Sequence, residues 1–335
     1  MATRVAINGF GRIGRVFFRA AWGNPDIEIV AINDLAPTET LAYLLKYDSV
    51  YRRAPFSVES KDDALIVDGK EVAFVHEPDL AKLPWGQYDV DVVVESTGVF
   101  TDPAKAQGHI DAGAKRVVIS APAKGEGAAT ILMGVNEDQF VTCPITSNAS
   151  CTTNAVSPLI GILNEAIGIE RAILNTVHSY TASQAIVDAP SKKDVREGRA
   201  AALNIVPTST GAAKATTLAH TSLAGKFDGI SLRVPTPAGS IADVTFVASR
   251  PTSVEEVNDA LKKAAADPRW DGVFTVTEDE LTSMDVVGQP YGSIADLAMT
   301  RVVDGTLVKV LGWYDNEAGY VHTLVKHVIA AGKTA

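Results

Sequence analysis

Cysteine is scarce in this chain, whose 335 residues include only Cys143 and Cys151. Two thiols are too few to cross-link so long a chain, and they form no C-x-x-C pair, so we expect neither a disulfide framework nor a bound metal. Long apolar runs are missing as well, since none approaches the roughly 18 residues that span a membrane, and the first residues show no secretory pattern. The sequence therefore predicts a cytoplasmic protein with no membrane partner.

Basic residues are in the minority, with 30 Lys and Arg against 40 Asp and Glu and a formal net charge of −10 at pH 7. This balance argues against a nucleic-acid partner, whose phosphates require a basic face. It still permits a small anionic substrate held by a few local cations. Hydrophobic residues make up 46% of the chain, as in ordinary globular proteins, and the length exceeds that of a single core, so we expect two domains.

The first 150 residues have the pattern of an α/β domain. An apolar run at residues 5–7 leads through N-G-F-G-R-I-G into an amphipathic helix, and a second strand at 28–32 ends at Asn33-Asp34. Further apolar runs, at 90–94, 116–120 and 131–135, are typical of strands buried on both faces. The pattern predicts a doubly wound parallel sheet with the Rossmann topology.

Longer strands dominate after residue 150. They are expected at 172–179, 230–234 and 244–249, and a hairpin is expected to turn at Asp304-Gly305. Ser253 and Glu256 form a capping box that opens a helix, and a final helix carries an apolar stripe from Tyr320 onward. This change of pattern predicts that a second, α+β domain begins near residue 151.

Gly9, Gly11 and Gly14 form a G-x-G-x-x-G motif between a predicted strand and a predicted helix. Asp34 follows about 20 residues later, at the end of the next strand, as in dinucleotide-binding folds. Its carboxylate would accept hydrogen bonds from a ribose and would repel a 2′-phosphate, which favours NAD over NADP. The alternative is an ordinary glycine turn without a ligand.

Cys151 lies in the stretch S-N-A-S-C-T-T-N at the start of a predicted helix. A free cysteine is often a small buried hydrophobe, but its polar neighbours and a helix N-terminus favour a thiolate here. A cationic imidazole beside the sulfur would favour that thiolate further. His178 is our candidate among six histidines, and sequence spacing leaves this pairing open.

Two further stretches carry hydroxyls, glycine and cations suited to anions. They are T-S-T-G-A-A-K at residues 208–214 and L-R-V-P-T-P at residues 232–237, which contains Arg233. Each stretch alone is equally consistent with a capping or turn motif.

Taken together and in this order, these motifs resemble the phosphorylating glyceraldehyde-3-phosphate dehydrogenases, with T-V-H-S-Y-T and W-Y-D-N-E-A-G-Y adding to the match. The resemblance implies that Cys151 is the nucleophile and His178 its base. It implies an NAD site made by Gly9, Phe10, Gly11, Arg12, Ile13, Asp34, Ser120, Asn316 and Tyr320. It also implies two anion sites, for the substrate phosphate and for inorganic phosphate, made by Ser150, Thr152, Thr181, Thr210, Gly211 and Arg233.

The family reaction is the NAD-dependent oxidation of D-glyceraldehyde 3-phosphate to 1,3-bisphosphoglycerate, through a cysteine thiohemiacetal and a thioester that inorganic phosphate attacks. The resemblance further implies a homotetramer with the segment 180–205 at a subunit interface. It also implies that a C-terminal helix, residues 316–335, completes the NAD-binding domain of residues 1–150. Residues 151–315 would then form the catalytic and tetramerisation domain.

Three alternative functions stay open at this stage. Erythrose-4-phosphate dehydrogenase shares most of the motifs but releases a free acid by hydrolysis. A thiol hydrolase or a non-catalytic nucleotide-binding protein would each leave part of the pattern unused. Two positions also depart from the family: Arg196-Glu197-Gly198-Arg199 stands where many relatives have R-R-A-R, and His76 stands where an arginine is common near the adenine.

Overall fold

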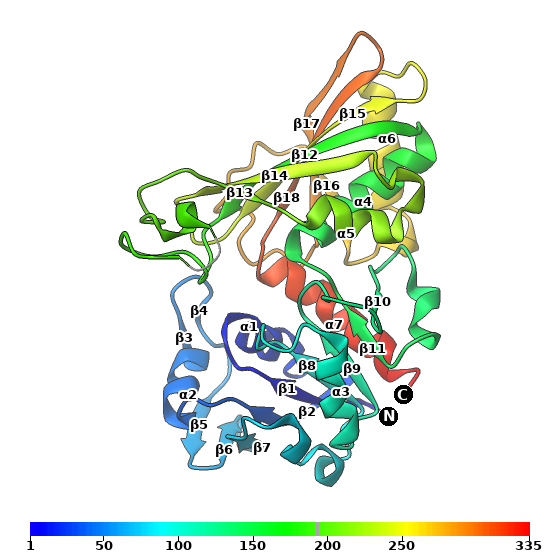
Figure 1. Cartoon of the computed structure of the whole chain (residues 1–335). Helices are drawn as coiled ribbons and strands as arrows, with labels where there is room; N and C mark the ends of the chain where they lie inside the picture. The colour runs from blue at the N-terminus through cyan, green and yellow to red at the C-terminus, as the bar shows by residue number, and fades with distance from the viewer. Residues whose placement is uncertain (192–193) are drawn as a thin grey trace. The chain divides into compact units, whose positions relative to one another are not determined.

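The structure is a computed structural model that describes residues 1–191 and 194–335. The chain divides into two compact units, the first made of residues 1–149 and 324–335 and the second of residues 150–323. Each unit contains one large sheet with helices packed on it (Figure 1). The expected combination of a Rossmann-type domain and an α+β domain is confirmed.

Within the described residues, nine strands form the sheet of the first unit in the order β10-β11-β9-β8-β1-β2-β7-β6-β5. Their bounds are β1 (Thr3–Asn8), β2 (Ile27–Asn33), β5 (Val58–Lys61), β6 (Ala64–Val67), β7 (Lys70–Val75), β8 (Val92–Glu95), β9 (Arg116–Ile119), β10 (Ala129–Thr130) and β11 (Ile145–Ser147). The strands from β10 to β7 run parallel, and β6 and β5 are antiparallel additions at one edge. A separate small ribbon joins β3 (Tyr47–Asp48) to β4 (Arg52–Arg53).

The chain reverses its direction across this sheet between β1 and β8. Helix α1 (Arg12–Ala21) connects β1 to β2 on one side, whereas α3 (Pro103–Asp111) connects β8 to β9 on the other, and α2 (Thr38–Lys46) follows β2. Ligands of doubly wound sheets bind at the carboxyl ends of strands where the order reverses. Gly9 follows β1 and Ser96 follows β8 at that point.

The strand expected at residues 131–135 is wrong. The two-residue strand β10 ends before it, and the chain then turns, with Gly134 at φ +79°. The Asn136 side chain closes this turn, since its Oδ1 accepts from Leu132 N at 2.8 Å and its Nδ2 donates to Thr130 O at 2.9 Å. Ile131 and Leu132 are buried, so the run is apolar because of its burial and not because of its secondary structure.

Among the described residues, seven strands form the sheet of the second unit in the order β13-β14-β12-β15-β18-β17-β16. Their bounds are β12 (Ile169–Ser179), β13 (Val206–Ser209), β14 (Phe227–Val234), β15 (Ser240–Ala248), β16 (Phe274–Thr277), β17 (Ser293–Val303) and β18 (Leu307–Tyr314). The pairing is antiparallel except between β12 and β14 and between β16 and β17. The helices α4 (Cys151–Ala166), α5 (Ala212–Ala219) and α6 (Val254–Ala265) pack on this sheet.

Local signals placed several of these elements correctly. Asp304 and Gly305 both have positive φ in the three-residue connection between β17 and β18, and Thr306 N donates to Val303 O across them. The Ser253 side chain accepts a hydrogen bond from Glu256 N at the start of α6. The final helix, α7 (Ala318–Gly332), begins after Asp315, whose Oδ1 accepts from Glu317 N and Ala318 N. No helix within the described residues has the length and apolarity needed to cross a membrane.

Candidate active site

Cys151 is the first residue of α4 in the second unit. Ser150 caps this helix, because its Oγ accepts from Thr153 N at 3.1 Å and also lies 2.8 Å from Thr153 Oγ1. Ala149, just before the cap, is buried and adopts φ +54°. The loop thereby places the thiol at a helix N-terminus, where backbone N–H groups and the helix dipole favour negative charge.

The imidazole of His178, near the end of β12, faces this thiol. His178 Nε2 lies 3.4 Å from Cys151 Sγ, and His178 Nδ1 lies 2.7 Å from the carbonyl oxygen of Ser179. A hydrogen bond to Ser179 O, which can only accept, requires the ring hydrogen on Nδ1, and in that tautomer Nε2 presents a lone pair to the sulfur. Arg233 Nη1, 3.0 Å from the same Nδ1, can only donate and favours the opposite tautomer. The structure thus brings the two candidate catalytic residues together in the geometry of a thiol and its base.

The charge beside the sulfur comes from Arg233 and not from the histidine. Arg233 Nη1 lies 3.0 Å from His178 Nδ1 and donates to Ser179 O at 3.2 Å. Burial and then the Arg233 charge lower the pKa of His178 to about 3, so its ring is neutral near pH 7. Burial raises the pKa of the Cys151 thiol, and the Arg233 charge opposes that rise. The expected cationic imidazole is therefore absent from this resting pair.

Tyr314, the last residue of β18, contacts both Thr152 and His178. Its hydroxyl lies 2.9 Å from Thr152 Oγ1, and its ring meets the His178 ring edge-on with centroids 5.8 Å apart. Burial, followed by the neighbouring Cys151, raises the pKa of Tyr314, so its hydroxyl stays protonated at neutral pH. Thr152, an expected anion ligand, is buried with its hydroxyl in this contact. Sequence reasoning missed Tyr314, although it lies in the W-Y-D-N motif.

In the first unit, the glycine motif forms one wall of a cleft of about 450 Å³ at the ends of β1, β2 and β8. A β-carbon on Gly14 would lie 2.2 Å from Gly9 O, so only glycine allows this approach of helix and turn. A β-carbon on Gly11 would instead meet nothing within 4 Å in the described part of the chain. Gly11 is the N-cap of α1, and open space above a helix N-terminus fits a pyrophosphate.

Asp34 lines the same cleft. Its Oδ2 accepts from Phe10 N at 2.7 Å and its Oδ1 accepts from Ala36 N at 2.9 Å, which fixes the carboxylate at the rim. The remaining lone pairs of a carboxylate can accept from ribose hydroxyls. These residues therefore fit a dinucleotide with an unmodified adenosine ribose.

Two family models match the chain: the NAD binding domain of glyceraldehyde 3-phosphate dehydrogenase over residues 3–103, and the C-terminal domain of that enzyme over residues 150–316. The chain is 50% identical over 335 residues to glyceraldehyde-3-phosphate dehydrogenase 2 of Streptomyces avermitilis, with 99% of each chain covered. The chain belongs to the glyceraldehyde-3-phosphate dehydrogenase family. It is also 51% identical over 327 residues to the Geobacillus stearothermophilus enzyme of that name, with 97% of each chain covered. The resemblance inferred from the motifs is confirmed, and NAD is the cofactor of the first domain.

The other residues expected at the NAD site of this glyceraldehyde-3-phosphate dehydrogenase domain differ in how they can act. The Phe10 side chain is fully buried against Phe18 and Phe74, so only its backbone is available. Arg12 forms an ion pair with Asp48 at 2.6 Å. Ile13 is half-buried in the first turn of α1, and Ser120 Oγ donates to Glu95 O at 3.1 Å.

Asn316 and Tyr320 belong to the second unit, whereas the glycine motif and Asp34 belong to the first. Asn316 Oδ1 accepts from Ser240 Oγ at 3.1 Å, and Ser240 Oγ accepts in turn from Ser179 N, next to His178. Tyr320 is buried in the first turns of α7. Hydrogen bonds through Ser240 therefore connect Asn316 to β12, the strand that carries His178.

The remaining expected anion ligands lie at turns of the second unit. Thr181 Oγ1 lies 3.1 Å from Ser183 Oγ, and Thr210 Oγ1 accepts from Ala212 N at 3.2 Å. Gly211 is the exposed N-cap of α5. A helix start with an exposed glycine and a neighbouring hydroxyl is suited to a phosphate.

The two departures from the family pattern have definite surroundings. Arg199 pairs with Asp188 at 3.0 Å, whereas the Arg196 side chain is exposed. His76 Nδ1 donates to the carbonyl oxygen of Asp34 at 2.8 Å, so this residue supports the turn that presents Asp34. In the residues that the structure describes, no cluster of three metal-binding side chains occurs.

Sequence reasoning assigned no role to the polar residues that end three adjacent parallel strands. They are Asn8 on β1, Asn33 on β2 and Glu95 on β8. The available signal was a polar side chain directly after each apolar run, because the carboxyl ends of parallel strands meet at one edge.

Proposed function

We propose that this protein oxidises D-glyceraldehyde 3-phosphate with NAD and inorganic phosphate to 1,3-bisphosphoglycerate. The observation that carries this proposal is the approach of Cys151 Sγ to His178 Nε2 at 3.4 Å. The names of the curated relatives, at about half identity over the whole chain, support the same substrate. We assign NAD binding to residues 1–150 with 316–335, and catalysis to residues 151–315.

The first step is proton transfer from the Cys151 thiol to His178 Nε2 as the sulfur attacks the aldehyde carbon. Because the resting imidazole is neutral, the base is ready to accept this proton. The backbone N–H of Cys151 and the protonated ring then stabilise the oxygen formed from the aldehyde, and the ring gives its proton to that oxygen, which yields the thiohemiacetal hydroxyl and a neutral His178. Ser179 O holds the ring in the required orientation through Nδ1–H.

NAD, when bound, would supply the hydride acceptor for oxidation of the thiohemiacetal to a thioester on Cys151. His178 removes the hydroxyl proton in that step. Ser150, Thr152, Thr181, Thr210, Gly211 and Arg233 would hold the substrate phosphate and the attacking inorganic phosphate. Attack by phosphate on the thioester carbon releases the Cys151 thiolate and yields an acyl phosphate.

We propose that the enzyme acts in the cytoplasm as a homotetramer. Ile173 on β12 and Ile230 on β14 are more than half exposed on one face of the second sheet. Within the segment 180–205, whose residues 192 and 193 lie outside the described residues, further large apolar side chains are exposed, including Val187 at 71% and Leu203 at 83%. Burial of such surface against other copies of the chain would stabilise an oligomer. Analytical ultracentrifugation tests this, and a monomer at micromolar concentration would contradict it.

The decisive test is NADH formation from glyceraldehyde 3-phosphate with and without inorganic phosphate. We expect phosphate-dependent turnover, and a loss of at least about a thousandfold in kcat in Cys151→Ser because a serine hydroxyl is a weak nucleophile. Cys143→Ser is the matched control, since that thiol lies in the other unit and donates to Gly127 O.

The same assay distinguishes the alternatives. Oxidation that is equally fast without phosphate would indicate release of a free acid by hydrolysis, as in erythrose-4-phosphate dehydrogenase. Mass spectrometry of the enzyme mixed with aldehyde and NAD, with phosphate withheld, should find an acyl group on Cys151. Undiminished turnover in Cys151→Ser would refute the mechanism.

A further inference from the structure

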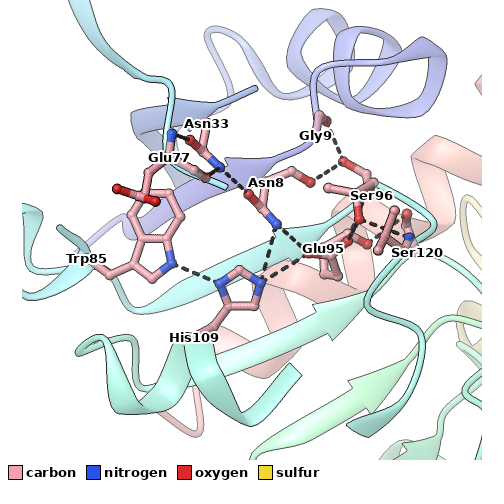
Figure 2. A network of polar contacts seen from close by, with 11 residues as sticks. Asn8, Gly9, Asn33, Glu77, Trp85, Glu95, Ser96, His109 and Ser120 are labelled. Atoms are coloured by element: carbon pink, nitrogen blue, oxygen red, sulfur yellow. Dashed lines mark hydrogen bonds and ion pairs between the residues drawn. The ribbon is translucent and has the colours of Figure 1, made fainter. Parts of the chain in front are cut away.

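An acidic side chain lies in the core of the first unit, directly behind the dinucleotide cleft. Glu95 ends β8 and is 2% exposed, and it pairs in register with Asn8 at the end of β1. His109 on α3 is fully buried beside it. Figure 2 shows the polar network in which both residues take part. A buried carboxylate is unfavourable unless its hydrogen bonds are satisfied, and three sets of partners satisfy those of Glu95.

The first set of partners runs from the backbone of Glu77 (Figure 2). Glu77 N donates to Asn33 Oδ1 at 2.9 Å, and Asn33 Nδ2 donates to Glu77 O at 3.0 Å, which fixes the orientation of this amide. Asn33 Nδ2 also donates to Asn8 Oδ1 at 2.7 Å. Asn8 must therefore present its Nδ2 to Glu95 Oε2, at 2.6 Å.

The second set of partners runs from Trp85. Its indole N–H can only donate, and it lies 3.0 Å from His109 Nδ1. The ring hydrogen of His109 is therefore on Nε2, which donates to Glu95 Oε2 at 3.0 Å. A doubly protonated His109 would oppose the Trp85 N–H, so the imidazole is neutral.

Thr97 supplies the third set. Its backbone N–H donates to Glu95 Oε1 at 2.9 Å, and its hydroxyl makes a short contact with the same oxygen. Val99 N donates to that hydroxyl oxygen at 3.0 Å, which leaves the hydroxyl hydrogen for Glu95. The carboxylate thus receives four donors, two on each oxygen.

All four partners are donors whose direction is set elsewhere in the network, so the side chain at position 95 can only accept. We infer that Glu95 is an ionised, buried carboxylate and a positioning residue for NAD binding. It acts through Asn8, Asn33 and Thr97, which line the cleft on both sides. Its backbone carbonyl accepts from Ser120 N at 2.9 Å, and Ser96 Oγ donates to Gly9 O at 2.7 Å next to it. The inference concerns NAD binding by the first domain and does not depend on the proposed reaction.

Glu95→Gln tests this inference, because it keeps the shape of the side chain and turns one acceptor into a donor. Either oxygen position would then face a fixed donor, Asn8 Nδ2 or Thr97 N. We expect the Kd for NAD to rise about tenfold, as for the loss of a hydrogen bond to a charged group. The KM for NAD should rise with it, while kcat at saturating NAD and the KM for the aldehyde stay within about twofold. Glu71→Gln is the matched control, since it makes the same change in an exposed ion pair with Lys61.

A second variant keeps the test decisive if Glu95→Gln fails to fold. His109→Phe removes one donor to Glu95 from a position behind the cleft wall, and we expect a smaller rise in the Kd for NAD in the same direction. Folded variants with the NAD affinity of Glu71→Gln would overturn the positioning role. Infrared difference spectra between wild type and Glu95→Gln should contain a carboxylate band, and a protonated-acid carbonyl band would overturn the ionised state.

Discussion

Arg233 stands opposite His178 in the parallel pairing of β14 with β12, and its Nη1 lies 3.0 Å from His178 Nδ1. Both groups share Ser179 O as their acceptor. One fixed cation therefore acts on both partners of the catalytic pair. It disfavours a charged imidazole, and it favours a charged sulfur.

Removal of this cation should make the thiol harder to ionise. In Arg233→Met we expect the pKa of Cys151 to rise, because its main favourable charge is lost, so alkylation by iodoacetamide at pH 8 should slow about tenfold. The pH profile of alkylation measures this directly. Arg233→Lys keeps the charge, and Cys151 in this variant should be alkylated at a rate between those of the wild type and Arg233→Met. A profile for Arg233→Met that coincides with the wild type would contradict the role given to Arg233.

Substitution of two glycines in the nucleotide motif should have different effects, one mainly on stability and the other mainly on NAD binding. Gly14→Ala places a methyl group 2.2 Å from Gly9 O, so we expect the free energy of unfolding to fall by about 1–3 kcal/mol. Gly11→Ala points a methyl group into open space at the cleft, so stability should change by less than about 0.5 kcal/mol while NAD binding weakens. Urea unfolding and NAD titration of both variants measure the two effects. Equal losses of stability in the two variants would contradict this division.

The choice between NAD and NADP should depend on Asp34. Asp34→Asn removes the negative charge that would repel a 2′-phosphate but leaves one oxygen to accept from Phe10 N. We expect kcat/KM for NAD to fall about tenfold and the preference for NAD over NADP to shrink. Steady-state kinetics with both cofactors measure the ratio. Leu35→Ala, next to Asp34 at the cleft, provides a neutral comparison in which the preference should change less.

The buried His327 should make stability sensitive to acid. Its Nε2 lies 2.8 Å from Thr146 Oγ1 and its Nδ1 3.2 Å from Asn148 Oδ1, and burial lowers its pKa to about 3. An unfolded histidine has a pKa near 6.5, so between about pH 6.5 and 3 the unfolded chain binds the extra proton. The contribution of neutral His327 to the free energy of unfolding is therefore fully present above about pH 6.5. As the pH falls, this contribution decreases by up to about 1.4 kcal/mol per pH unit.

Urea unfolding of the wild type and His327→Gln from pH 7 to pH 4.5 checks this expectation. The variant should have a shallower dependence of its unfolding free energy on pH, even if it is less stable at pH 7. His178 contributes in the same direction in both proteins, because its pKa is also lowered to about 3. Identical slopes for the two proteins would contradict the assignment of a buried neutral His327.

The elements that sequence patterns predicted correctly depend on neighbouring residues. The first helix follows from its apolar spacing, the hairpin from Asp304-Gly305, and the start of α6 from the contact between Ser253 and Glu256. The order of the motifs was sufficient to identify the family. The run at 131–135 misled the prediction because its burial, and not its backbone, requires apolar side chains.

The sequence by itself determined the family, the cofactor class and the chemical types of the candidate site residues, because these depend on residue identity and short spacings. The tertiary structure decided which groups face one another. It placed Arg233 beside His178 from 55 positions away, paired Thr152 with Tyr314, and directed four donors at Glu95. Charge state and hydrogen-bond direction in a buried site depend on such long-range contacts and on exclusion of water, neither of which is encoded in a local pattern.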